Sequence, residues 1–384
     1  MSISNPRSCV LVLGCGITGL QTAFSLLKAG YFVTIVAEHF PGDTSIEYTS
    51  PWAGGVWRAH STLAPEDKEV AAWDQATLDE WTRLLREGDG AADIEEKCGL
   101  GIRECVNYWS IENAETVKDG SGLWWKSAVE DFRLVSEEEL AHVSASSGEK
   151  IGFGVRYKTV FINIPKYLQW LFSQVQDLGA NFLKSPIKTD NGADGVISGM
   201  LQLVAETDKS MGRPKTVVEA VVLAAGLSSR HFLPTNEGGK LYPVRGQTVL
   251  VKGEAKIGVT HLFPSENGEL LYVIPRPSSG TTILGGCKQV GNWDAGEDKE
   301  LTQRILERVK RLKESKEIVG ENGEFEVVSV QVGRRPGRIG GPRVDIEKEK
   351  VHGVKVIYSY GHSGAGYQNS VGSAAKVVRL LIGK

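Results

Sequence analysis

The chain has 384 residues, of which 41% are hydrophobic, and a net charge of -3 from 44 basic and 47 acidic residues. This length allows two domains or one large one, and the composition is ordinary for a globular protein. The near balance of charge gives no electrostatic reason to expect a nucleic acid or a membrane surface as partner, so we exclude both.

The chain ends and the cysteines indicate a cellular setting. Residues 1–7 are polar, and the apolar run that follows is short, so we expect neither a signal peptide nor a transmembrane helix. The five cysteines show no C-x-x-C spacing. We therefore expect no metal site and no disulfide framework, which fits a reducing, intracellular compartment. The last three residues, 382–384, are not a peroxisomal targeting tripeptide.

The first elements in the chain form a strand, a glycine turn, a helix and a second strand. The apolar run 9–13 enters the turn 14–19, and residues 20–27 show helical apolar spacing. Strand 32–37 then ends on the acidic residue Glu38. This order predicts a Rossmann-type dinucleotide site.

Each turn glycine has a separate physical role in such a site. Gly14 would make the tight turn, Gly16 would let the backbone approach a pyrophosphate, and Gly19 would let the helix lie close to the strand. Glu38 would accept hydrogen bonds from ribose hydroxyls, and its charge argues against NADP. The motif leaves FAD and NAD both open, and a tight turn that binds nothing is the competing interpretation.

A turn of small residues over 50–57 follows, flanked by Trp52 and Trp57. Its small residues would allow the backbone to approach a flat ring system, and a loop packed by the two aromatic side chains explains it equally well. Residues 66–88 predict a helix from their apolar spacing.

The middle of the chain predicts strand 151–161, helix 167–178 and the buried strand 217–223, which stops at Ala224-Ala225-Gly226. These small residues would bring a second backbone segment towards the cofactor, so the Rossmann layer is expected to be discontinuous in sequence. Charged stretches that contain glycine are expected to be loops, namely 189–198, 206–215 and 312–324.

Several short strands dominate the last third. They are predicted over 247–251, 270–274, 281–284, 325–333 and 351–358. Together they suggest an antiparallel sheet that forms a roof over the substrate. The glycine-rich turn 360–368 leads into a helix over 369–382, whose N-terminus suits partial negative charge on a ring carbonyl.

Taken together, these segments resemble the D-amino-acid oxidase and D-aspartate oxidase family of FAD enzymes. The resemblance covers nearly the whole chain. Its motifs are the opening glycine turn, Ser50–Trp57, Ala224–Gly226, Arg245–Thr248, Tyr272–Pro275, Leu284–Gly286, Gly291–Trp293, Val332–Pro336 and Tyr360–Gln368. The early proline-tryptophan turn and the closing Ala-Gly-Tyr-Gln are more similar to fungal members.

The resemblance implies an α/β fold with two domains. It implies a discontinuous, Rossmann-like FAD-binding domain over 1–60, 155–235 and 345–384. A substrate-binding domain with a mostly antiparallel sheet would occupy 61–154 and 236–344.

The implied reaction is oxidation of a D-amino acid by hydride transfer from Cα to N5 of a non-covalently bound FAD. The products would be a 2-oxo acid, ammonia and hydrogen peroxide, with O₂ as second substrate. Such chemistry depends on positioning, so no catalytic general acid or base side chain is expected. The family also implies a possible homo-oligomer and a peroxisomal location.

The resemblance assigns cofactor contacts to residues in several segments. They are Gly14, Gly16, Ile17, Thr18, Gly19, Glu38, His39, Ser50, Gly54, Gly55, Val56, Ile187, Ala225, Gly226, Gly364, Gly366, Tyr367 and Gln368. For the substrate it assigns a bidentate α-carboxylate clamp to Arg335, assisted by the Tyr272 hydroxyl, and an amine contact to the Gly364 carbonyl.

Lys288 is the residue that bears on the choice of substrate. By the resemblance, this place is aromatic in oxidases of neutral substrates and basic, an arginine, in mammalian D-aspartate oxidases, so a preference for D-aspartate is predicted, with D-glutamate weaker. Arg58 and His60 could add positive potential, and His60 matches a histidine of D-aspartate oxidases. In the alternative, Lys288 extends into solvent and the enzyme is a broad oxidase of neutral D-amino acids.

Three further functions remain open. An NAD-dependent dehydrogenase would use the same N-terminal motif, but it would leave the C-terminal glycine turn unexplained. A flavoprotein without catalytic activity would leave Arg335 and Tyr272 without a role. A sarcosine or glycine oxidase is the nearest competing enzyme.

Overall fold

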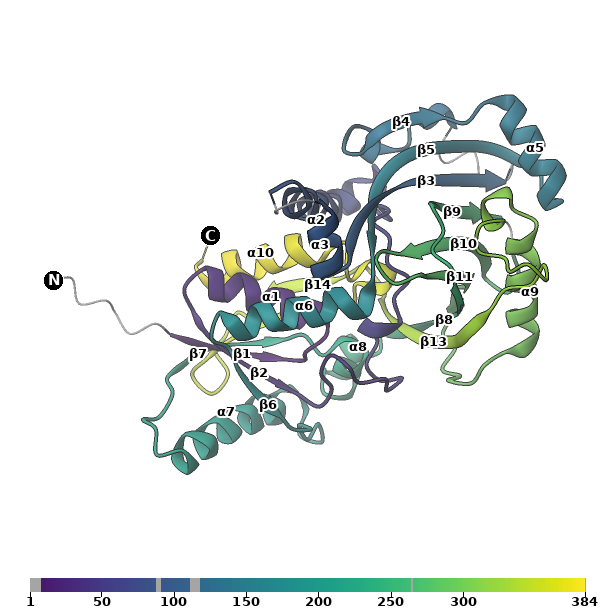
Figure 1. The fold of residues 1–384 in the computed structure, drawn as a ribbon. Coiled ribbons are helices and arrows are strands. Elements are labelled where there is room, and N and C mark those ends of the chain that lie inside the picture. Colours follow the sequence, from purple (N-terminus) through teal and green to yellow (C-terminus); the bar gives the residue numbers. More distant parts are fainter. Residues whose placement is uncertain (1–7, 88–90, 111–117, 264, 384) are drawn as a thin grey trace. The chain divides into compact units, whose positions relative to one another are not determined.

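The computed structural model describes residues 8–87, 91–110, 118–263 and 265–383 (Figure 1). Residues 1–7, where we expected no signal peptide, and Lys384 at the end of the chain lie outside this part. The chain divides into two compact units. Unit 1 comprises 1–51, 168–243 and 335–384, and unit 2 comprises 52–167 and 244–334. The assignment of FAD binding and substrate binding to two separate domains stays a prediction.

Unit 1 is built on a sheet whose strand order among the described residues is β14-β15-β7-β1-β2-β6. Its strands are β1 (Cys9–Leu13), β2 (Phe32–Ala37), β6 (Asn181–Lys184), β7 (Val218–Leu223), β14 (Arg343–Ile346) and β15 (Lys355–Tyr360). Neighbours pair in parallel, except that β14 runs antiparallel to β15. All five residues of β1 are buried, as expected for a parallel strand covered on both faces.

Helices cover both faces of this sheet (Figure 1). Helix α1 (Ile17–Lys28) lies beside α10 (Ser370–Leu381) on one face. Helix α7 (Gly192–Ser210) covers the other, where its residues Ile197 and Met200 join Leu11 in one core cluster. The remaining helices of this part are α6 (Ile164–Asp177), which begins in unit 2, and the short α8 (Thr235–Gly238).

Two predictions for these segments were wrong. The stretches 189–198 and 206–215 were expected to be loops, but α7 spans most of the first and the first half of the second. Packing of its apolar face, which includes Val196 and Val204, outweighs the low helix propensity of its glycines. The run 351–358 was assigned to the antiparallel sheet, whereas β15 pairs in parallel with β7 in unit 1.

Unit 2 contains a larger sheet with the order β12-β8-β11-β10-β9-β3-β5-β4, and β13 also pairs with β8. Its strands are β3 (Leu100–Ser110), β4 (Glu130–Leu134), β5 (Ile151–Ile162), β8 (Leu241–Lys252), β9 (Ile257–Leu262), β10 (Glu269–Arg276), β11 (Thr281–Cys287), β12 (Gln289–Val290) and β13 (Val327–Arg338). Along this order from β12 to β4 the pairing is antiparallel except between β3 and β9. The sequence predictions missed β3, β4, β9 and the short β12.

Helices of unit 2 pack on this sheet and at its margin. They are α2 (Lys68–Glu87), α3 (Ala91–Cys98), α5 (Glu137–Ser147) and α9 (Lys299–Lys310). On one sheet face, Leu271 and Val273 of β10 form a core with Leu301 and Ile305 of α9. Because side chains alternate along a strand, Tyr272 and Ile274 lie on the opposite face.

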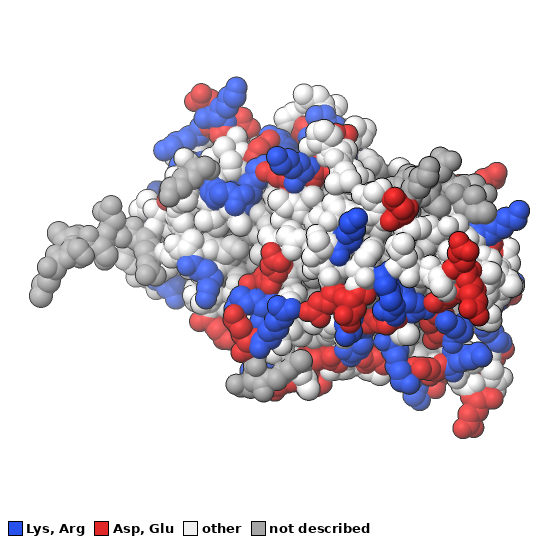
Figure 2. Space-filling view, turned by 90° about the horizontal axis from the view of Figure 1, so that it is seen from above, with Lys and Arg blue, Asp and Glu red and all other residues white. Residues whose placement is uncertain are grey.

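The distribution of surface charge and the apolar character of the helices both bear on possible partners. On the face drawn in Figure 2, basic and acidic side chains are interspersed. None of the helices in the described ranges combines the length and apolar character that a bilayer span requires.

A half-buried carboxylate connects α8 to the end of β13 and to β15 within unit 1. Glu237 accepts hydrogen bonds from Arg338 at 2.7 Å, from the Tyr360 hydroxyl at 3.0 Å and from Lys240 at 3.0 Å. Burial acts to raise the pKa of Glu237, but these hydrogen bonds outweigh it and lower the pKa to about 2. The folded pKa is thus below the ordinary value of about 4.3. The stabilisation is present above about pH 4.3 and is lost as the pH falls towards 2.

We expect Glu237→Gln to lower the free energy of unfolding at pH 7 by up to about 3 kcal/mol, because the pKa difference is about two units. At pH 2 the variant and the unaltered protein should unfold alike. Urea unfolding at the two pH values measures this. Glu349→Gln, at an exposed carboxylate, is the control. Equal stability of Glu237→Gln and the unaltered protein at pH 7 would contradict the prediction.

Candidate functional site

The predicted glycine turn requires glycine at two of its positions. Gly14 has φ +103°, and a Cβ there would lie 2.6 Å from the Ala224 carbonyl oxygen. A Cβ on Gly19 would lie 2.0 Å from the Gly14 carbonyl oxygen. The start of α1 therefore packs backbone against backbone on the end of β1, as the spacing predicted.

The N-terminus of α1 carries no charge that would repel an anion. Gly16 is the N-cap residue, and the first turn, which includes Thr18, has no acidic residue. The Ile17 N–H donates to the Ser50 hydroxyl at 3.0 Å, and a Cβ on Gly16 would lie 2.8 Å from that oxygen. Together with the helix dipole, these groups can hold a phosphate.

Two other predicted segments meet this turn within unit 1. Ala225 and Gly226 follow β7, next to the Ala224 carbonyl that contacts Gly14. Gly364 lies in the short 3₁₀ helix Ser363–Ala365. It is followed by Gly366, where a Cβ would lie 3.7 Å from Ile17, by Tyr367, whose hydroxyl donates to the Ser50 carbonyl at 3.0 Å, and by the buried Gln368. Three backbone segments far apart in sequence thus lie together.

The predicted ribose side of the site lies after β2. The Gly14 N–H donates to the Val36 carbonyl at 2.9 Å, which places the exposed Glu38 close to the glycine turn. His39 Nδ1 lies 2.7 Å from Asp43, and this hydrogen bond lowers the pKa of the Asp43 carboxyl. Ile187, half-buried, packs on the core cluster that includes α7.

The predicted contacts in the turn 50–57 belong partly to unit 2, where protein contacts already account for its glycines. Gly55 has φ +96°, and a Cβ there would lie 2.2 Å from the Ile162 carbonyl oxygen. A Cβ on Gly54 would lie 2.8 Å from Ile274, and Val56 forms a β-bridge with Phe161. Cofactor contact by Gly54, Gly55 and Val56 stays a prediction.

Tyr272 is packed between neighbouring strands of unit 2. It is 8% exposed and pairs with Gly285 of β11. A Cβ on Gly285 would lie 2.0 Å from its ring, and one on Gly286 would lie 2.7 Å from its hydroxyl oxygen. The glycine pair, part of a motif by resemblance alone, therefore makes room for the tyrosine ring.

A polar row that the sequence predictions missed crosses the same sheet face. Asn107 of β3 pairs with Thr260 of β9, which pairs with Tyr272. Asn107 is 1% exposed and donates to the Tyr157 hydroxyl at 3.0 Å. No local pattern marked this row, because polar Asn107 interrupts the apolar residues at the end of β3 and its partners lie on other strands.

Arg58 lies close enough to Tyr157, the hydrogen-bond partner of Asn107, for its charge to act on the Tyr157 hydroxyl. Trp57 N–H donates to the Val160 carbonyl, so the segment 56–58 runs antiparallel to β5 and Arg58 continues towards Thr159. Arg58 is half-buried, and its guanidinium lies 3.3 Å from His60 Nε2. In the described part of the chain, no carboxylate is within ion-pair distance of Arg58.

Lys288 and Arg335, the other two basic residues predicted to contact the substrate, lie on or after strands of the larger sheet. Lys288 follows β11, its N–H donates to the Gly268 carbonyl at 2.7 Å, and its side chain is exposed. Arg335 is half-buried on β13, after Arg334 and before Pro336. The structure brings Arg58 and His60 together, and the substrate roles of all these residues stay predictions.

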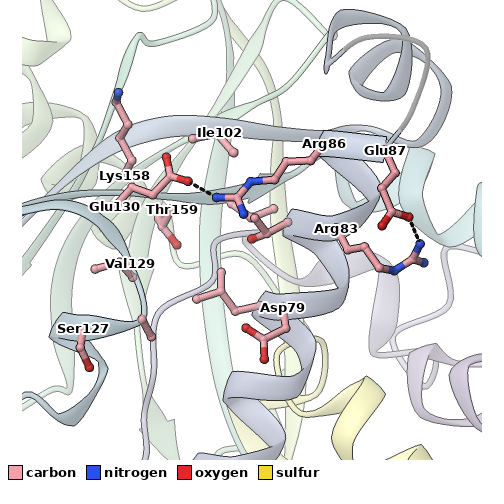
Figure 3. Close-up of a pocket in the computed structure, with 14 residues that line it drawn as sticks. Asp79, Arg83, Arg86, Glu87, Ile102, Ser127, Val129, Glu130, Lys158 and Thr159 are labelled. Atoms are coloured by element: carbon pink, nitrogen blue, oxygen red, sulfur yellow. Dashed lines mark hydrogen bonds and ion pairs between the residues drawn. The ribbon is translucent and has the colours of Figure 1, made fainter.

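One cavity in unit 2, of about 520 Å³, lies among residues of α2, β3 and β5 and the segment 127–130 (Figure 3). Its basic residues are all in ion pairs: Arg86 with Glu130 at 2.6 Å, Lys158 with Asp131 at 2.8 Å, and Arg83 with Glu80 at 2.8 Å. No predicted site residue lines this cavity. It therefore offers no unbalanced charge for an anionic substrate.

Comparison with known proteins gives the family. Residues 9–380 match the family DAO, described as FAD dependent oxidoreductase. The chain belongs to this family. A D-amino-acid oxidase of Fusarium vanettenii is 33% identical over 382 residues, which cover 97% of this chain and 96% of that protein. A D-aspartate oxidase of Talaromyces thermophilus is 27% identical over 395 residues, which cover 97% and 95%.

A solved structure agrees on the fold. Glycine oxidase from Geobacillus kaustophilus superposes with a TM-score of 0.70 at 20% identity, and the match covers 99% of this chain and 96% of that one. The predicted family, α/β fold class and FAD cofactor are confirmed. The chain's own residues fit FAD, because the close-packed glycines place at the end of β1 a helix N-terminus whose first turn has no acidic residue and whose N-cap, Gly16, has no side chain that would compete with a pyrophosphate.

We expect Gly16→Ala to weaken FAD binding by about tenfold or more, because the new Cβ would lie 2.8 Å from the Ser50 oxygen, at the start of α1. Titration of the apoprotein with FAD, followed by absorbance, measures the affinity. Gly199→Ala is the matched control, since a Cβ there makes only an ordinary 3.7 Å contact with Ile187. Equal FAD affinity of both variants would show that Gly16 is not at the phosphate site.

Proposed function

We propose that this chain oxidises D-amino acids with O₂, and that it prefers acidic substrates, D-aspartate above D-glutamate. The balanced reaction is D-amino acid, O₂ and water giving 2-oxo acid, ammonia and hydrogen peroxide. The names of the Fusarium and Talaromyces relatives support the coarser statement. The preference for an acidic side chain rests on the residues of this chain.

The observation that carries this preference is the environment of Arg58. It is half-buried, and it has no carboxylate partner among the described residues. Its charge acts on Cys105 and on Tyr157, which accepts a hydrogen bond from Asn107 of the polar row. Burial raises the pKa of the Cys105 thiol to about 12, and a hydrogen bond from Tyr157 and the charge of Arg58 act in the opposite direction. A partly desolvated guanidinium without a carboxylate partner is ready to bind a substrate carboxylate.

The proposed roles divide the substrate into three parts. Arg335 binds the α-carboxylate through its planar fork, and the Tyr272 hydroxyl donates to the same group. The Gly364 carbonyl accepts a hydrogen bond from the amine. Arg58 and His60, with Lys288 at the margin, bind the side-chain carboxylate. FAD, when bound, accepts the two electrons that the amino acid loses, and the protein contributes orientation and exclusion of water.

The exposure of Lys288 favours a second candidate, broad oxidation of neutral D-amino acids. A lysine at the end of β11 that extends into solvent would impose no charge on the substrate. In that case Arg58 would gain no carboxylate partner during turnover, which is unfavourable for a partly buried charge.

Steady-state kinetics followed by peroxide release test the preference with D-aspartate, D-glutamate, D-alanine and glycine. We expect kcat/KM for D-aspartate to exceed that for D-alanine by about tenfold or more. Arg58→Leu should lower kcat/KM for D-aspartate by about tenfold to a hundredfold, since a charged hydrogen bond contributes about 1.5–3 kcal/mol. Its kcat/KM for D-alanine should change by less than about threefold.

Arg213→Leu, at an exposed arginine in unit 1, controls for the loss of one positive charge. Faster turnover of D-alanine than of D-aspartate by the unaltered enzyme would reject the acidic preference. A preference for D-aspartate that Arg58→Leu leaves unchanged would transfer the role to Lys288, which Lys288→Ala then examines. Turnover of glycine alone would assign the chain to the glycine oxidases.

A further inference from the structure

Arg334, the residue before the proposed carboxylate clamp, is held from one side by an aromatic residue of unit 2. Its guanidinium donates to the Trp293 carbonyl at 2.6 Å and lies 5.5 Å from the centre of the Trp293 ring. On the preceding residue, Gly333, a Cβ would lie 2.6 Å from Trp52. Strand alternation puts Arg334 and Arg335 on opposite sides of β13. The last residues before Arg335 are therefore fixed by contacts on successive sides of the strand.

Trp293 is 38% exposed, yet the segment that carries it is attached to the interior. Arg245 donates to the Asp294 carbonyl at 3.0 Å, to the Gly296 carbonyl at 2.5 Å and to the Gln289 side chain at 2.9 Å. These bonds hold the backbone that follows Trp293 and the Gln289 side chain that precedes it. The partly exposed Trp293 ring is therefore carried by a backbone segment that hydrogen bonds from Arg245 hold in place.

Gln247 extends the same attachment towards α9. Its side-chain N–H donates to the Asp298 carbonyl at 2.7 Å, and the Asp298 N–H donates to its side-chain oxygen at 2.8 Å. Arg245 also donates to that oxygen at 2.9 Å. Two neighbouring side chains of β8 therefore hold the segment 289–298.

Arg245 is an unusual anchor because it is 1% exposed, and its partners are neutral oxygen and sulfur atoms. In the described ranges it has no carboxylate within ion-pair distance. A buried charge is costly unless all its donors are used, so this arrangement tolerates little displacement of the carbonyl groups. The segment around Trp293 is correspondingly well defined.

We propose that Arg334, anchored by Trp293, is a positioning residue for Arg335. The inference rests on the proposed role of Arg335 as the α-carboxylate clamp. A bidentate clamp needs its planar fork in one orientation, and a small rotation of the strand at residue 334 would misalign both hydrogen bonds. Arg334 itself does not contact the substrate in this proposal.

The test uses the holoenzyme at saturating FAD and a graded series of variants. Arg334→Met removes both contacts with Trp293, whereas Trp293→Leu removes only the ring contact and Trp293→Phe retains an aromatic face. We expect KM for the best substrate to rise about tenfold, about threefold and less than twofold, in that order, with kcat changed less than about twofold. Arg213→Met serves as the control for loss of a cation.

A second measurement separates positioning from general damage. Propionate has the carboxylate of D-alanine but no amine, so it binds the clamp without being oxidised. Its competitive inhibition constant should rise in each variant by the same factor as KM, while FAD content and Tm stay within those of the control. Arg334→Lys should recover part of the loss, because a charge over the Trp293 ring is retained.

The results separate this inference from the proposed function. If the unaltered enzyme oxidises no D-amino acid, the proposed function is wrong. If it does, unchanged KM and propionate inhibition in Arg334→Met overturn the positioning role, and so does a fall in kcat without a change in KM. Should Arg334→Met fail to fold, Trp293→Leu and Trp293→Phe decide, and equal values for the two overturn the proposal.

Discussion

Unit 1 depends on backbone atoms that approach each other at places where no Cβ fits. The Gly14 carbonyl lies under the start of α1 because Gly19 has no side chain, and the end of β7 reaches the turn because Gly14 has none. These contacts fix the position of the α1 N-terminus relative to the carboxyl ends of β1 and β7. In an open parallel sheet this edge is where a ligand binds, since it holds unpaired N–H groups from several loops.

The elements that could be predicted from the sequence are those whose signal is local. The apolar runs of β1 and β7 and the amphipathic spacing of α10 needed no knowledge of partners. Strand β3 gave no such signal because charged residues interrupt it. Arg103 is compensated by Glu95 and Glu254, and Glu104 by Arg156. These ion pairs join residues that are distant in sequence, so they can be recognised only in the folded chain.

The candidate site shows the same division. The spacing of Gly14, Gly16 and Gly19 predicted the turn and the close approach of Gly19 to the Gly14 carbonyl, which is a local backbone contact. The approach of Ala224 to Gly14 and of the Ser50 side chain to Gly16 involves segments distant in sequence. The need for glycine at position 285 could not be predicted, because it arises from the ring of Tyr272, which lies on the paired strand. Asn107 was missed for a related reason: its polar partner Tyr157 is on another strand, so its burial has no local trace. Contacts between residues that are distant in sequence therefore limit what sequence patterns alone can predict about the site.

The arginines of unit 2 differ in how their charge is balanced, and this difference bears on function. Arg156, almost buried, is neutralised by Glu104 and Glu139, as stability alone would require. Arg245 is solvated by fixed carbonyl dipoles, which orders a segment and leaves the local potential positive. Among the described residues Arg58 has neither a carboxylate nor such a set of carbonyls, and its neighbour His60 can only accept from it as a neutral ring. A half-buried guanidinium left in this state lowers the stability of the empty protein. In the function we propose, the side-chain carboxylate of the substrate would remove that deficit, so that the cost Arg58 imposes on folding would be returned as selectivity.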